Sequence, residues 1–100
     1  MIHVWTWCGE YFGYLQDNNL WTYSGKHIGK YVDDEIYNSA GKYIGEIKNE
    51  NRLIVSNHKK HKTWRPFTLL ANTAGYAKYA NYAGYAMYLE YENFPNPECF

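Results

Sequence analysis

The feature that most constrains the fold is a unit that recurs every sixteen residues. Its three copies begin at Gly9, Gly25 and Gly41, and each has a second glycine four positions later. An apolar-aromatic pair precedes each copy at one fixed offset: Val4-Trp5, Leu20-Trp21 and Ile36-Tyr37. A regular period of this kind indicates one supersecondary unit used several times, so we expect a repeat structure.

Each copy is typical of a strand, a polar turn and a second strand. Short alternating runs separated by polar turns favour β-hairpins over helices, and we expect turns at residues 16–19, 33–35 and 48–51. Residues 52–55 are expected to close the third unit. The first glycine of each pair is expected to have a positive φ, and the second to allow a bulge or close backbone approach. We therefore interpret G-x-x-x-G as scaffold, because no phosphate-loop Lys-Ser/Thr follows it and no apolar helix contains it.

The segment 1–7 is predicted to be a strand without a hairpin partner of its own. Pairing with a late segment would close the sheet and remove its exposed edges. Three hairpins and one composite unit then make four. The predicted fold class is all-β, with repeated β-hairpins in a closed or ring-like small sheet or barrel and an extended Tyr/Ala-triplet C-terminal segment.

The units C-GEYFGYL, SGKHIGKY and SAGKYIGEI, each followed by a short turn and an apolar-aromatic strand, resemble the bacterial and phage four-fold beta flower family. The resemblance covers about residues 1–56. It implies hairpin petals around a pseudo-four-fold axis. Because the family has no established activity, the resemblance implies no functional residues.

We expect one domain over residues 1–100, with hairpin repeats at 1–56, a basic connector at 57–70, a Tyr/Ala triplet segment at 71–94 and a disordered tail at 95–100. The formal net charge is zero, but residues 51–89 contain six cations and no acid. A local basic surface is therefore expected despite the neutral total.

Aromatic residues recur every third position from Tyr76 to Phe94, with alanines between them. A helix would spread these rings around its whole circumference, so the period favours an extended path, with two strands turning near Gly84 as one form of it. A helix buried on all sides is the rival. The triplets are interpreted first as core or an oligomer seam, and second as a ladder for stacking a ligand.

No motif for catalysis is present: there is no nucleophile elbow, no H-E-x-x-H and no pair of carboxylates with a sign of being brought together. We expect no enzyme activity and no cofactor. His58 and His61 lack further ligands nearby, so no metal site is expected. Cys8 and Cys99 are expected to be free thiols in a cytoplasmic protein, and no stretch is apolar enough for a membrane helix.

The connector and the first triplets combine cations with rings, which suits a ligand that has both phosphate and base. The candidate ligand-binding residues are Lys59, Lys60, Lys62, Trp64, Arg65, Phe67, Tyr76 and Tyr79. A neutral total charge disfavours non-specific duplex nucleic acid. The hypothesis is a non-enzymatic binding protein that sequesters a small anionic nucleotide-like ligand such as a cyclic oligonucleotide. The alternative is a structural or protein-interaction module that forms a homo-oligomer through the Tyr-Ala segment.

Overall fold

The computed structural model describes all residues 1–100, and its regular structure consists of eight strands and two short 3-10 turns. The strands are β1 (Ile2–Thr6), β2 (Tyr11–Gln16), β3 (Asn19–Thr22), β4 (His27–Val32), β5 (Glu35–Tyr37), β6 (Tyr43–Lys48), β7 (Arg52–Ser56) and β8 (Tyr91–Asn93). The 3-10 turns are η1 (Asn57–Lys59) and η2 (Pro97–Cys99). There is no α-helix, so the all-β prediction is confirmed.

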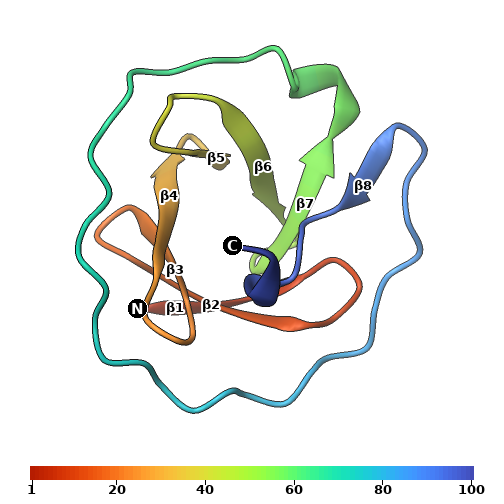
Figure 1. Ribbon diagram of the computed structural model, residues 1–100. Coiled ribbons are helices and arrows are strands. Elements are labelled where there is room, and N and C mark those ends of the chain that lie inside the picture. Colours follow the sequence, from red (N-terminus) through yellow and green to blue (C-terminus); the bar gives the residue numbers. More distant parts are fainter.

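The first seven strands form a closed barrel. Each strand from β1 to β7 pairs antiparallel with the next, and a parallel pairing of β1 with β7 closes the ring, with Trp5 opposite Arg52. Strand β8 pairs antiparallel with the end of β7 (Figure 1). The outer edge of β7 is thus covered by β1 near its start and by β8 near its end. Strand β1 therefore closes the sheet through β7, the last strand of the third unit, and is not paired with β8.

Tight turns with two consecutive positive-φ residues join the strands of each hairpin. Asp17 and Asn18 have φ of 53° and 62°, and Asp33 and Asp34 have φ of 50° and 67°. This is the conformation of a type I′ turn, whose twist matches that of antiparallel strands. Asn and Asp tolerate it better than most residues. The predicted polar turns are therefore the hairpin turns of the barrel.

The two glycines of a unit have different roles. Gly25 has a φ of +94°, and a Cβ added there would overlap the carbonyl oxygen of Thr73. Gly13 lies beside a bulge, because Val4 pairs with Gly13 whereas Trp5 pairs with Tyr11. The same register shift recurs one and two units later. Both predictions for the glycine pair are confirmed.

The interior of the barrel is filled by alternate side chains of these strands, since successive residues of a strand point to opposite faces. The buried cluster consists of Val4, Phe12, Leu15, Leu20, Ile28, Ile36, Tyr37, Tyr43, Leu53, Val55 and Phe94. All but Phe94 come from the seven barrel strands, so the hairpin repeats themselves supply most of the core.

Residues 64–90, the strap, encircle the outside of the barrel as one extended segment without helix or strand (Figure 1). The extended path is as predicted, but the strap does not reverse at Gly84. The reason for a glycine there is close approach: a Cβ on Gly84 would lie 2.6 Å from the carbonyl oxygen of Cys8. A Cβ on Gly75 would lie 2.9 Å from the Ser24 carbonyl oxygen.

Six backbone hydrogen bonds hold the strap in a repeating register. The first donors are the amides of Trp64, Thr73 and Tyr82, and their acceptors are the carbonyls of Gly41, Gly25 and Gly9. Three residues after each donor, the amides of Phe67, Tyr76 and Tyr85 donate to Ser39, Tyr23 and Trp7. Nine residues of strap therefore match sixteen residues of barrel, and the two run in opposite directions. We call the end of the barrel that holds Gly9, Gly25 and Gly41 the strap end.

The strap's tyrosines contact the barrel within the same chain. Tyr82 stacks on Trp5 with ring centroids 3.8 Å apart, and the Trp5 indole N–H donates to the carbonyl of Ala80 at 3.0 Å. Arg52 is buried without a carboxylate partner and donates to the Ala83 carbonyl at 3.0 Å, while its guanidinium lies 4.3 Å from the ring centroid of Tyr85. The triplets thus form an outer aromatic layer on the barrel.

The C-terminal residues pack into the strap end instead of forming the expected disordered tail. Phe94 and Pro97 are buried, and the ring of Phe100 lies 5.7 Å from the rings of both Phe12 and Phe94. The C-terminus therefore lies in the middle of the barrel in Figure 1. The segment looks polar in sequence, but the rings of Phe94 and Phe100 at its two ends are apolar and pack against the barrel interior.

Candidate ligand-binding site

The basic connector turns part of its charge inward. The ammonium of Lys62 lies 2.9 Å from both carboxylate oxygens of Glu35. That of Lys59 lies 3.3 Å from Glu35 and 3.1 Å from Glu46. Both glutamates are buried. Two of the predicted ligand-binding lysines therefore neutralise buried acids of β5 and β6 and are not free for an anion.

Two tyrosines complete this network. The Tyr37 hydroxyl donates to Glu35 at 2.8 Å, and the Tyr43 hydroxyl donates to Glu46 at 2.7 Å. Burial and the bond to Glu35 raise the pKa of Tyr37 to about 12. Burial alone would raise the pKa of Glu35, but hydrogen bonds from Lys62, Tyr37 and Lys59 outweigh it and lower that pKa. Glu35 is thus held ionised, and both carboxylates contact lysine and tyrosine.

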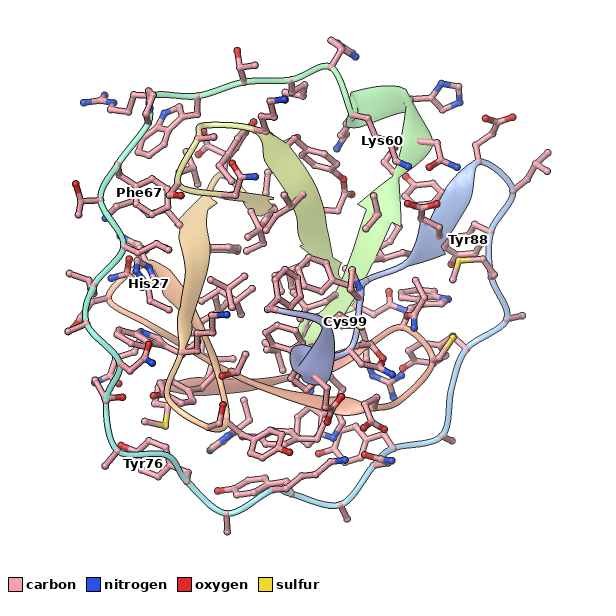
Figure 2. All side chains as sticks on the ribbon, in the orientation of Figure 1. His27, Lys60, Phe67, Tyr76, Tyr88 and Cys99 are labelled. Carbon is pink, nitrogen blue, oxygen red and sulfur yellow. The ribbon has the colours of Figure 1, made fainter.

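The remaining connector residues lie along the strap or beside it. Lys60 pairs with Glu92 at 2.8 Å, and both side chains are about half exposed. Arg65 lies over the ring of Trp64, 5.0 Å from its centroid, and Phe67 lies against His27 with centroids 5.7 Å apart. Figure 2 shows Lys60 near η1 and Phe67 on the strap, far apart from each other.

The two tyrosines predicted to bind a ligand pack against the barrel instead. Tyr76 meets the edge of Tyr14 with centroids 5.2 Å apart, and Tyr79 stacks on Tyr11 at 5.0 Å. The eight predicted residues are therefore spread along the connector and strap, and the structure does not bring them together as one site. Lys60 alone among them lines the hollows described next.

Two adjacent hollows open at the strap end, and both are lined by Phe100. The larger, about 360 Å³, is formed by Lys42, Tyr43, Ile44, Val55, Lys60, Glu92, Pro95 and Phe100. The smaller, about 260 Å³, is formed by Lys26, His27, Ile28, Asn38, Ser39, Ile44, Leu69 and Phe100. Their apolar floor comes from the barrel interior and the C-terminal residues, and three lysines and one carboxylate lie around it.

The charge at these hollows is mainly positive. Lys26 and Lys42 are exposed and make no ion pair, whereas Lys60 pairs with Glu92. Burial lowers the pKa of His27, so this imidazole is neutral at pH 7. Its Nδ1 accepts the amide of Leu70 at 2.9 Å, which leaves Nε2 to donate to the carbonyl of Gly29. The lysines thus supply the positive charge, and His27 holds the strap.

Lys26 and Lys42 were missed as site residues, although the sequence contains a signal for them. Both directly follow the first glycine of a unit, sixteen positions apart, so equal placement in adjacent petals was foreseeable. Glu10 has that place in the first unit and pairs with Lys78 at 2.8 Å. Phe100 gave no comparable signal, because its role depends on the path of the last residues.

No group of three or more His, Cys, Asp and Glu side chains is placed to hold a metal ion. His61 is exposed, and the ring of His58 lies 3.5 Å from Glu90. None of the helical elements is long and apolar enough to cross a membrane.

The geometry defines a class of protein: a small barrel of repeated hairpins, closed by its first strand and encircled by a C-terminal strap. A family model described as 4-fold beta flower protein matches residues 2–88. The chain belongs to the 4-fold beta flower family. The match extends beyond the hairpin repeats to nearly the whole strap, and it ends before β8. Comparison with curated proteins and with solved structures finds no match.

Proposed function

We propose that this protein is a non-enzymatic binding protein for a small anionic ligand with an aromatic ring, of the nucleotide or cyclic oligonucleotide class. The observation that supports it most is the pair of hollows at the strap end, where three lysines surround apolar and aromatic residues. Holding the ligand without converting it would make the protein a sequestering agent.

The charges suit a phosphate group. Lys26 and Lys42 have no acidic partner, so an incoming anion would not have to displace an existing ion pair at either residue. The exposed pair of Lys60 with Glu92 is worth little in water and is readily exchanged. A phosphate between these lysines would make charge-assisted contacts, which are stronger than neutral hydrogen bonds.

The apolar lining suits a planar ring. Tyr43 and Ile44 line the larger hollow, and Ile28 and Ile44 line the smaller one. Stacking of a base on an aromatic side chain contributes about 1–3 kcal/mol. The larger hollow lies within the range of roughly 300–1,000 Å³ that small-molecule sites occupy.

The state of the buried acids supports binding over catalysis. Glu35 and Glu46 are each in contact with lysine and tyrosine, so neither is placed as a free general base. Both cysteines are free thiols, which suits the reducing cytoplasm where nucleotides occur.

Calorimetry with ADP, cyclic di-AMP and cyclic di-GMP tests the proposal. The double variant Lys26→Gln/Lys42→Gln should weaken binding by roughly tenfold or more, since each charged contact contributes about 1 kcal/mol or above. Arg65→Gln is the matched control. It removes the positive charge of a residue that the sequence predicts to bind the ligand but that lines neither hollow. It should leave the affinity within about twofold.

Absence of heat with all three ligands would refute the proposal. If the double variant and the control weaken ligand binding equally, the ligand binds at the connector and not at the hollows. Light scattering addresses the alternative of an oligomerising module. The strap's rings already contact the barrel of their own chain, so we expect a monomer. A stable assembly that binds none of the three nucleotides would favour the module.

A further inference from the structure

The last six residues lie over the proposed site. The chain leaves the barrel wall at Phe94, which is buried, and η2 then directs Phe100 toward the middle of the strap end (Figure 1). Figure 2 shows Cys99 near the centre of the molecule, inside the ring formed by the strap. Phe100 is the one aromatic residue that lines both hollows. Together with Ile44, which also lines both, it stands between the two hollows.

Residues 95–100 are attached to the barrel by apolar packing alone. Their backbone hydrogen bonds are internal: the amide of Cys99 donates to Asn96 at 2.9 Å, and that of Phe100 donates to Pro97 at 3.3 Å. No side chain of this segment makes a hydrogen bond or ion pair with the rest of the chain. The strap, by contrast, makes six backbone hydrogen bonds with the barrel. Displacing the segment breaks no polar contact with the barrel.

Phe100 occupies the place that a ligand ring would take. Its ring lies 5.7 Å from that of Phe12 at a near-perpendicular 83°, and 5.7 Å from that of Phe94 at 24°. Edge and offset-stacked contacts of this kind are those an aromatic base would make with the same two side chains. Lys42 and Lys60 line the larger hollow with Phe100, and Lys26 lines the smaller one with it.

We propose that residues 95–100 are a self-inserted plug that competes with the ligand for the strap-end site. This rests on the proposed function, and it adds a regulatory device to that site. In the plugged form the two hollows are separate and small. Withdrawal of Phe100 joins them into one chamber with an aromatic floor and a rim of three lysines. The family match ends at residue 88, so the plug is an addition to the part of the chain that matches the family model.

Competition makes a quantitative prediction. A ligand that binds only the open form has an apparent affinity reduced by the fraction of open molecules. Phe100→Ala removes the ring and should lower the Kd for cyclic di-AMP or ADP by roughly tenfold, as for a plug that is closed about nine-tenths of the time. The matched control is Leu89→Ala, which also removes an apolar side chain but at a position that is 89% exposed and lines neither hollow. It should bind like the wild type.

The outcomes separate the two proposals. If the wild type binds and Phe100→Ala binds equally or more weakly, the plug is refuted and the binding function stands. If neither protein binds either probe, the binding function fails and the plug with it. If Phe100→Ala binds at least fivefold more tightly and Leu89→Ala does not, both are supported.

A second measurement on the wild type does not depend on any substitution. The amides of Cys99 and Phe100 are hydrogen bonded within η2. A saturating probe that expels the plug should speed their hydrogen exchange, while the strap amides of Thr73 and Tyr82 stay protected. Unchanged exchange at Cys99 and Phe100 in the saturated protein would show that the ligand leaves the plug in place, and would overturn the inference.

Discussion

Substitution of Gly25 by alanine should strongly destabilise the fold. The residue has a φ of +94°, which an L side chain rarely adopts, and the new Cβ would overlap the carbonyl oxygen of Thr73 in the strap. The backbone strain costs about 1–2 kcal/mol. Moving the strap away loses the bonds from Thr73 to Gly25 and from Tyr76 to Tyr23, at about 1 kcal/mol each. We expect a loss of about 3–4 kcal/mol, a large part of the total stability of a small domain.

Urea unfolding followed by tryptophan fluorescence measures this loss. Two of the tryptophans, Trp5 and Trp7, contact strap residues, so displacement of the strap also alters the native baseline. Lys26→Ala is the matched control, because Lys26 is the next residue, is exposed and has no positive φ. It should change the unfolding free energy by no more than about 0.5 kcal/mol.

A further variant separates strain from overlap at the same position. Asparagine tolerates a positive φ better than alanine but has the same Cβ. If overlap with the strap dominates, Gly25→Asn will destabilise about as much as Gly25→Ala. A Gly25→Ala protein as stable as Lys26→Ala would refute the claim that the strap's close approach requires glycine.

Three other changes test the buried contacts. The pKa of Tyr37 is raised to about 12 from 10.0, so the folded chain keeps a proton that the unfolded chain loses. The unfolding free energy should therefore fall as the pH rises from about 10 to about 12, and Tyr37→Phe should reduce this slope in urea titrations at several pH values. Lys62→Met leaves the buried carboxylate of Glu35 with less compensation and should cost about 1–2 kcal/mol, against about 0.5 kcal/mol or less for Lys60→Met in the same assay. Arg52→Lys cannot form both carbonyl contacts or stack on the strap and should lower the midpoint of thermal unfolding, whereas an unchanged midpoint would contradict the role given to the guanidinium.

The hairpins were predictable because their determinants are local. Turn residues such as Asp17 and Asp33, and the glycine of each unit, fix strand boundaries within a few positions of themselves. The resemblance that could be recognised in these units covers only residues 1–56, whereas the family match continues to residue 88. The path of the strap could not be predicted from its own residues, because its partners are distant in sequence. Its nine-residue period is explained only by the sixteen-residue period of the barrel strands to which it bonds.

The site was predicted less well, because charge counted along the chain differs from charge in space. Lys59 and Lys62 belong to a segment without acids, but Glu35 and Glu46, from strands more than ten residues earlier, lie against them. Lys42 lies in a half of the chain that is net acidic, yet it is exposed and makes no ion pair. Sequence patterns supplied the types of residue for an anion site, and tertiary folding decided which of them are available.

The register between strap and barrel also sets an order of assembly. Trp64 lies closest in sequence to its acceptor, Gly41, while Tyr82 bonds to Gly9 across most of the chain. Joining distant residues directly costs more loop entropy, and such non-local contacts slow folding. Once the first contact has formed on a folded barrel, each later one requires only three or six further residues of the strap to be ordered. We therefore expect the strap to zip on from Trp64 toward Tyr85, so that a misplaced first contact would shift every contact after it.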